Sequence, residues 1–265
     1  MSSTSGQPVL LGSLLAPYKA WQEYSEDTEA LIHLTHEGFR HVSLRPQTLH
    51  LLGYTDEEIQ PDRWKAGKAE GEIRAGFPTL HAHALLGLWG AFERFVEDTF
   101  TALIVAQPEL LEGERFARIK LSMRAALASG EERAQAVLYE ITRNTSGPKK
   151  LGVNQFEDLL DHLSLSGEVP ENVKDSVFAA QQVRHVWAHR GGVADAQFVG
   201  RYPTRAQVGE KLMIDISEFS RYMHGLHMYG LVIVNRYLKE IDEPPVLKEC
   251  RGYEGTWESI GLSGK

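Results

Sequence analysis

The chain has 265 residues, 42% of them hydrophobic, and a formal net charge of −8 at pH 7. This length and apolar content suffice for one domain with or without an extension, while no apolar run approaches the roughly 18 residues of a membrane span. The acidic balance argues against a surface that binds nucleic acid broadly, although a local basic cluster can still contact RNA.

The single cysteine, Cys250, excludes an internal disulfide and is typical of a reducing cytosol. No basic residue precedes the first short apolar patch, so we expect neither a secretory signal nor attachment to a membrane. The sequence has no glycine-rich phosphate loop of the Walker or Rossmann type, and no cofactor is expected. These features predict a cytoplasmic protein.

Helical periodicity begins close to the N-terminus. A helix is expected over residues 18–39, followed by a loop or a short exposed helix over residues 56–68. Gly38, Gly53 and Pro61 are expected to interrupt the pattern.

The clearest helix is expected over residues 80–106, where large apolar side chains recur at three- and four-residue spacing. Pro108 ends this pattern. Glu93 lies among its aromatic residues, so its side chain either pairs with Arg184 across a bundle or is an ordinary exposed carboxylate.

Three shorter helices are expected next, over residues 114–129, 131–144 and 155–163. Asn154 and Glu157 have the spacing of a capping box that opens the third of them. This part of the chain also carries a basic cluster, made of Arg115, Arg118, Lys120, Arg124, Lys149 and Lys150. The cluster is either a solvated helix face or a local contact for RNA.

A further helix is expected over residues 171–189. The pattern is aperiodic over residues 193–207, and residues 211–215 suit a brief extended segment. Asp215 is expected to cap a long final helix. The whole pattern predicts an all-α fold with short connections.

We expect three parts in this all-α chain. They are an N-terminal helical extension over residues 1–75, a helical bundle over residues 76–243 and a C-terminal tail over residues 244–265.

Residues 183–192, V-R-H-V-W-A-H-R-G-G, are the most informative stretch. At about 100° per residue, Arg184 and Trp187 share an otherwise apolar helix face with Val177. A guanidinium keeps its proton, so burial without a partner is costly. Arg184 therefore either faces an acid across the bundle or borders a solvated cleft that holds anions.

The end of this helix has the groups that RNA cleavage by a 2′-hydroxyl requires. Gly191 and Gly192 predict a left-handed helix stop, which puts His189 in the last turn. The negative helix end favours a protonated imidazole, which can donate a proton to a leaving oxygen. The donors of Arg184 match phosphate oxygens and can hold the charge that develops on phosphorus.

The spacing of Arg184 and His189 favours a site shared between two chains. The two residues diverge by roughly 140° on an unbroken helix, so one chain's pair does not meet a single phosphate efficiently. A two-fold homodimer would place Arg184 beside the partner's His189. Trp187 is expected to pack in that interface or to stack on a base.

The same segment resembles the R-x4-H signature of HEPN domains, most closely the RiboL-PSP-type branch. The resemblance covers residues 80–241 and includes the Gly-Gly and Val-Ala-Asp residues after His189, the V-G-E-K-L-M-I-D stretch and the final helix. It implies a dimeric α-helical bundle that cuts RNA without a metal. It also implies a toxin or antiviral defence effector, with an antitoxin or defence-system partner.

The resemblance assigns catalysis to Arg184 and His189, with His185 as a third candidate that orients the phosphate or assists proton transfer. Many relatives carry Asn or another polar residue at the position of His185. Gly191 stands where toxins silenced by a nucleotidyltransferase antitoxin often carry Tyr, so that modification is not available at this position. Three further residues are expected to contact substrate: Arg190, Trp187 and Glu93, the last of which resembles an acidic residue of the first HEPN helix.

Two alternatives to a metal-independent endoribonuclease remain open at this stage. His185 and His189 are one turn apart and suit a shared zinc ion. Other histidines would have to complete that site, from the set His33, His36, His41, His81 and His83. The second alternative is a non-catalytic helical module that binds RNA or a partner protein, because a fold does not fix a function.

Overall fold

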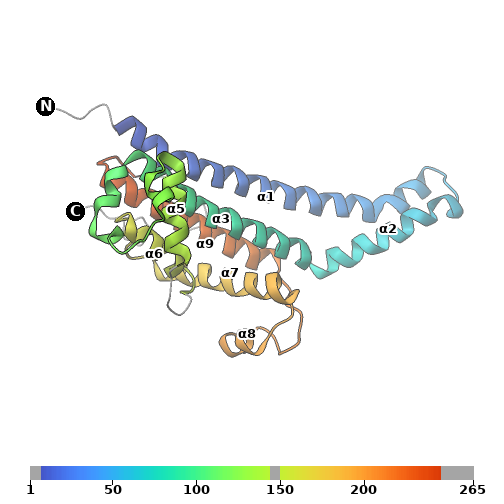
Figure 1. The fold of residues 1–265 in the computed structure, drawn as a ribbon. Coiled ribbons are helices and arrows are strands. Elements are labelled where there is room, and N and C mark those ends of the chain that lie inside the picture. The colour runs from blue at the N-terminus through green and yellow to red at the C-terminus, as the bar shows by residue number, and fades with distance from the viewer. Residues whose placement is uncertain (1–6, 144–149, 246–265) are drawn as a thin grey trace. The chain divides into compact units, whose positions relative to one another are not determined.

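The computed structural model describes residues 7–143 and 150–245, and within these ranges the chain is built of helices (Figure 1). The described residues form no β-strand, and extended pairing among them is limited to an isolated antiparallel bridge between Val193 and Lys211. The predicted all-α class is therefore confirmed. Across the same two ranges, no helix combines the length and the hydropathy that a membrane crossing requires.

Most of the connections between the described helices are short, and the one between α8 and α9 spans residues 202–215. In chain order they are α1 (Gln7–Leu51), α2 (Asp56–Ala75), α3 (Pro78–Ala106), the 3-10 helices η1 (Pro108–Glu112) and η2 (Glu114–Phe116), α4 (Met123–Leu127), α5 (Gly130–Arg143), α6 (Asn154–His162), α7 (Glu171–Arg190), α8 (Ala196–Arg201) and α9 (Ile216–Glu240).

The chain divides into two compact units that alternate along the sequence. Unit 1 contains residues 1–22, 89–181 and 224–265, and unit 2 contains residues 23–88 and 182–223. The helices α1, α3, α7 and α9 each contribute residues to both units. The expected boundaries after residues 75 and 243 do not coincide with this division and stay a prediction, and most of the expected tail, with Cys250, lies outside the described residues.

The core of unit 1 is aromatic and centres on α3, whose predicted position over residues 80–106 is confirmed. Phe92 is fully buried, and its ring centroid lies 5.2 Å from that of Trp21, 5.2 Å from that of Phe156 and 5.6 Å from that of Tyr229. These rings come from α1, α3, α6 and α9. Burial of large aromatic side chains thus holds four sequence-distant segments together.

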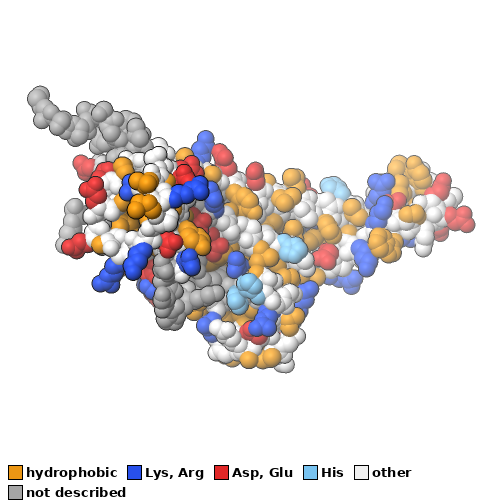
Figure 2. All heavy atoms as spheres, in the orientation of Figure 1, with side chains coloured by type: hydrophobic (Ala, Val, Ile, Leu, Met, Phe, Trp, Pro, Cys, Tyr) orange, Lys and Arg blue, Asp and Glu red, His pale blue; other side chains and the backbone are white. Residues whose placement is uncertain are grey.

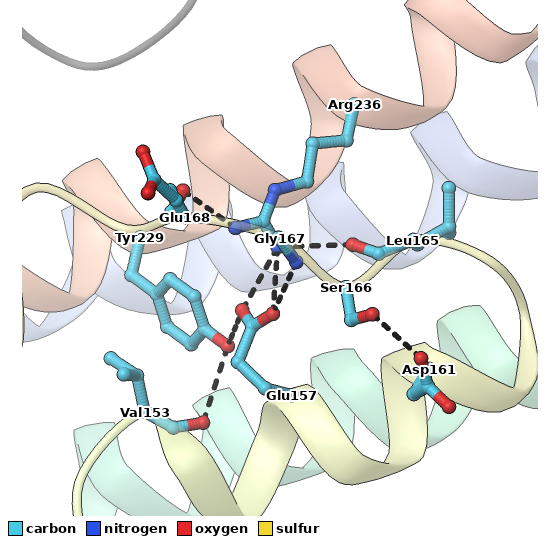
Figure 3. Close-up of polar contacts among 9 residues, drawn as sticks. All are labelled: Val153, Glu157, Asp161, Leu165, Ser166, Gly167, Glu168, Tyr229 and Arg236. Atoms are coloured by element: carbon cyan, nitrogen blue, oxygen red, sulfur yellow. Dashed lines mark hydrogen bonds and ion pairs between the residues drawn. The ribbon is translucent and has the colours of Figure 1, made fainter.

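A largely buried ion pair, with both side chains 13–14% exposed, fastens the α6–α7 connection to α9 in unit 1 (Figure 3). The guanidinium of Arg236 lies 2.9 Å from Glu157 and donates to the carbonyl oxygens of Leu165 and Glu168. Glu157 also accepts a hydrogen bond from the Tyr229 hydroxyl at 2.6 Å. The predicted capping box at the start of α6 is therefore wrong, because the Glu157 carboxylate is used by partners far away in sequence.

In unit 2, α1 and α2 are longer than the sequence predicted. Gly38 lies inside α1 and Pro61 inside α2, so neither residue ends a helix. Thr55 and Glu58 form a capping box at the start of α2. This cap supports a helix where the charged sequence was compatible with either a loop or a short exposed helix. A glycine inside a helix costs about 1 kcal/mol, which packing readily outweighs.

A column of four rings forms the inner part of unit 2. His36 stacks on Phe77 at 4.2 Å between centroids, His81 follows at 5.4 Å, and Phe219 stacks on His81 at 5.6 Å. His81 is fully buried, and its Nδ1 lies 2.8 Å from the carbonyl oxygen of Ile214. Burial lowers the pKa of His81, so the ring is neutral at pH 7.

The helix predicted over residues 114–129 is wrong in extent. Only the short elements η2 and α4 form there, and Phe116 is the single buried side chain among residues 114–127. Without an apolar stripe to bury, a helix of that length gains too little from packing. A second departure is α8, which forms inside the aperiodic region because Asp195 caps it by accepting a hydrogen bond from the Phe198 amide.

Candidate functional site

The candidate site is the C-terminal half of α7, which belongs to unit 2. Helix α7 ends at Arg190, and Gly191 and Gly192 follow with φ of +60° and +86°. The Gly192 amide donates to the carbonyl oxygen of Val186 at 3.2 Å, which closes the helix end. The predicted left-handed stop is confirmed, and His189 lies in the last turn.

The imidazoles of His185 and His189 lie side by side on the exposed face of α7. Their ring centroids are 4.7 Å apart, and both side chains are exposed. Partial burial and the neighbouring His189 lower the pKa of His185. A lowered pKa keeps the His185 ring neutral at pH 7, and a neutral imidazole can accept a proton.

Arg184 is half-buried and lacks an ion-pair partner among the described residues. Its Nε is buried and has no hydrogen-bond partner within these residues. Because an arginine keeps its charge, an unpaired guanidinium favours the second alternative from the sequence, a position beside a site that holds anions.

Glu93, the other proposed partner of Arg184, is engaged within its own helix. Its carboxylate accepts a hydrogen bond from the Trp89 indole at 2.7 Å. Glu93 belongs to unit 1 and Arg184 to unit 2, so the expected pair stays a prediction.

Trp187 packs within its own chain. Its side chain is 9% exposed, and a Cβ on Gly192 would lie only 2.9 Å from the indole ring. The ammonium group of Lys211 lies 5.3 Å from the centre of the same ring. The ring is therefore sandwiched locally, which leaves little of it free to stack on a base.

Arg190 and Asp195 connect the helix end to α8. Arg190 Nε lies 3.6 Å from the carboxylate of Asp195, and the arginine side chain remains 59% exposed. Arg190 is therefore accessible to solvent, and its expected contact with a substrate stays a prediction.

The stretch of sequence that carries the candidate site is basic within an acidic chain, although Arg205 in this stretch pairs with Glu218 outside it. Residues 182–211 contain five Arg or Lys and two Asp or Glu, a formal charge of +3, whereas the whole chain carries −8. In the space-filling view, histidine side chains reach the surface over α7, and Lys or Arg side chains lie between them and α8 (Figure 2). Local charge of this sign favours an anionic ligand.

The basic cluster from the sequence has a structural role in part. Arg115 lies 3.4 Å from the carboxylate of Asp161, Lys150 pairs with Asp158, and Arg124 lies 3.8 Å from Glu132. These acids neutralise three of its members, which favours the solvated-surface interpretation. Lys149 lies outside the described residues.

The histidines that a zinc site would need are not assembled with His185 and His189. His81 and His36 are taken up by the ring column of unit 2. Within residues 7–143 and 150–245, no three His, Cys, Asp or Glu side chains come close enough to hold a metal ion.

Lys211 is the site residue that the sequence did not reveal. It approaches Trp187 only because the bridge to Val193 folds the chain back onto the end of α7. Its one signal in the sequence was the short extended segment expected over residues 211–215.

Comparison of the chain with protein-family models, with curated proteins and with solved structures gave no match in any of the three. The resemblance to HEPN domains therefore rests on the residues around Arg184 and His189 and stays a prediction.

Proposed function

We propose that the protein is a metal-independent endoribonuclease, whose catalytic groups are Arg184, His185 and His189. The observation that carries the proposal is the pairing of two exposed imidazoles, 4.7 Å apart, beside an arginine without a carboxylate partner among the described residues. Acid, base and anion clamp are the three groups that transesterification of RNA requires. The locally basic charge of residues 182–211 supports an anionic substrate.

The chemistry follows from the properties of the three side chains. Neutral His185 accepts the proton of the ribose 2′-hydroxyl, whose oxygen then attacks phosphorus. The 5′-oxygen leaves with a proton from His189, while Arg184 stabilises the negative charge on the non-bridging oxygens. The products are a 2′,3′-cyclic phosphate and a 5′-hydroxyl end.

The proposal includes a homodimer with shared sites. Arg184 and His189 diverge by roughly 140° around α7, so Arg184 of one chain is proposed to act with the partner's His189. The two imidazoles of one site then come from a single chain, because His185 and His189 are neighbours on one helix. The resemblance to HEPN domains adds the proposal of a cytoplasmic toxin or defence effector with a restraining partner.

Cleavage of RNA in the presence of a chelator tests the proposal. His189→Ala and Arg184→Ala are expected to abolish cutting, and a substrate with a 2′-deoxy sugar at the cut position is expected to resist. The matched control is His41→Ala, which removes an exposed histidine of α1 outside the site. Circular dichroism verifies that each variant is folded.

Three outcomes would contradict the proposal. Wild-type cutting by either site variant would show that the roles are misassigned, and loss of activity in chelator would show that a metal takes part. Intact RNA that nevertheless binds the wild-type protein would leave the non-catalytic binding module in its place.

A further inference from the structure

We infer that Lys211 is a substrate-binding residue, which contacts a phosphate of single-stranded RNA next to the scissile one. The inference rests on the proposed function, since it extends that site from α7 onto the segment between α7 and α9, in which α8 lies. It adds a contact for binding and assigns Lys211 no part in the chemical step.

The backbone holds Lys211 beside the end of α7. The Leu212 amide donates to the carbonyl oxygen of Gly192, and the Ala194 amide donates to that of Glu210, both at 2.8 Å. These bonds flank the bridge between Val193 and Lys211. The position of Lys211 is thus set by main-chain hydrogen bonds, which a change of its side chain leaves intact.

The side chain of Lys211 is oriented but not neutralised. Its ammonium lies 5.3 Å from the centre of the Trp187 ring, a cation–π arrangement, and Lys211 is exposed. It forms no ion pair with any residue that the structure describes. An oriented ammonium with free donors can bind a phosphate oxygen at little entropic cost.

Trp187 links Lys211 to Arg184. Arg184 lies one turn before Trp187 on α7, and neighbours at this spacing share a helix face. Lys211 thus lies over the indole and Arg184 shares the helix face of Trp187, and neither cation has a carboxylate partner among the described residues, in a chain whose net charge is −8. Adjacent phosphates of a single strand are the ligand that would neutralise both.

The chain offers a matched control for this cation–π pair. Lys68 lies 5.8 Å from the centre of the Trp64 ring on α2, is exposed, and also forms no ion pair within the described residues. Lys68→Gln therefore removes the same kind of charge from the same kind of aromatic ring, away from α7.

The test measures binding and cleavage separately, with Lys211→Gln and Lys68→Gln. Binding of a short fluorescein-labelled single-stranded RNA of mixed sequence is followed by anisotropy in a His189→Ala background, over a series of salt concentrations. We expect Lys211→Gln to weaken binding about fivefold at about 0.1 M salt and to reduce the slope of log K against log salt by about 0.7. In the active protein it is expected to raise KM and leave kcat unchanged.

The outcomes separate this inference from the proposed function. Equal affinity and equal salt slope for Lys211→Gln and Lys68→Gln would overturn the inference, even if the wild-type protein cuts RNA. RNA binding that depends on Lys211 in a protein that never cuts would uphold Lys211 as a contact for an RNA phosphate and refute the endoribonuclease. If the RNA does not bind at all, both are refuted.

Discussion

Gly192 is predicted to be the least replaceable glycine at the end of α7. It has φ of +86°, and a Cβ at this position would lie 2.9 Å from Cε2 and 3.0 Å from Cδ2 and Cζ2 of Trp187. Gly191 also has a positive φ, of +60°, but a Cβ there would meet nothing within 4 Å. The two glycines thus separate the cost of the backbone conformation from the cost of the contact.

The expected magnitudes follow from this geometry. Alanine in the left-handed region costs about 1–2 kcal/mol, and overpacking adds about 1–3 kcal/mol. Gly191→Ala is therefore expected to lower the free energy of unfolding by about 1–2 kcal/mol, and Gly192→Ala by about 2–5 kcal/mol. The larger cost arises because the indole is a rigid ring under Lys211, which cannot move aside like the end of a flexible side chain.

Urea unfolding of the two variants, followed by circular dichroism, provides the comparison. The same samples are assayed for RNA cleavage, where we expect Gly192→Ala to be the more damaging substitution because it displaces Trp187 beside Arg184. Equal destabilisation by the two substitutions would refute the reasoning, since it would show that the contact with Trp187 carries no cost.

Three further predictions concern stability, each measured by urea unfolding. Arg236→Met is expected to lower the free energy of unfolding by about 3 kcal/mol, because the largely buried Glu157 loses its cation. Adding Glu157→Gln should recover part of this loss, and equal losses in the single and double variants would contradict the reasoning. Because burial lowers the pKa of His81 below 6.5, the unfolded ring binds a proton at higher pH than the folded one. The free energy of unfolding should therefore fall as the pH drops below about 6.5, by up to about 1.4 kcal/mol per pH unit for this residue. The fall should be shallower in His81→Leu. An unchanged dependence on pH in this variant would contradict the prediction. Asp215→Ala is expected to lower the free energy of unfolding by about 1 kcal/mol, because the Asp215 carboxylate accepts a hydrogen bond from the Glu218 amide at 2.8 Å at the start of α9. An unchanged free energy of unfolding would contradict the role of Asp215 as a helix cap.

Local signals in the sequence predicted the elements whose stability is local. Apolar spacing located α3, the glycine pair located the end of α7, and the Asp215 cap located the start of α9. The capping box at Glu157 failed because this carboxylate is used by Arg236, 79 residues away. A local rule cannot anticipate a competing partner that only the folded chain brings close.

In the candidate site, too, local features were predictable from the sequence and non-local ones were not. Its helix and the proximity of His185 and His189 follow from spacing along one helix, which the sequence displays directly. Lys211 was missed because its approach to Trp187 depends on the bridge to Val193, 18 residues before it in the chain. Non-local pairing of this kind leaves no periodic pattern in the sequence.

Complementation between two inactive variants tests the shared site most directly. Arg184→Ala and His189→Ala proteins are each expected to be inactive, but a mixed dimer keeps one site with an intact Arg184 and the partner's His189. In an equal mixture that exchanges subunits, half of the dimers are mixed, so the account predicts recovery of about a quarter of the wild-type cleavage rate. A mixture that stays as inactive as its components, although the wild-type protein cuts and subunit exchange is verified, would contradict a site shared between two chains.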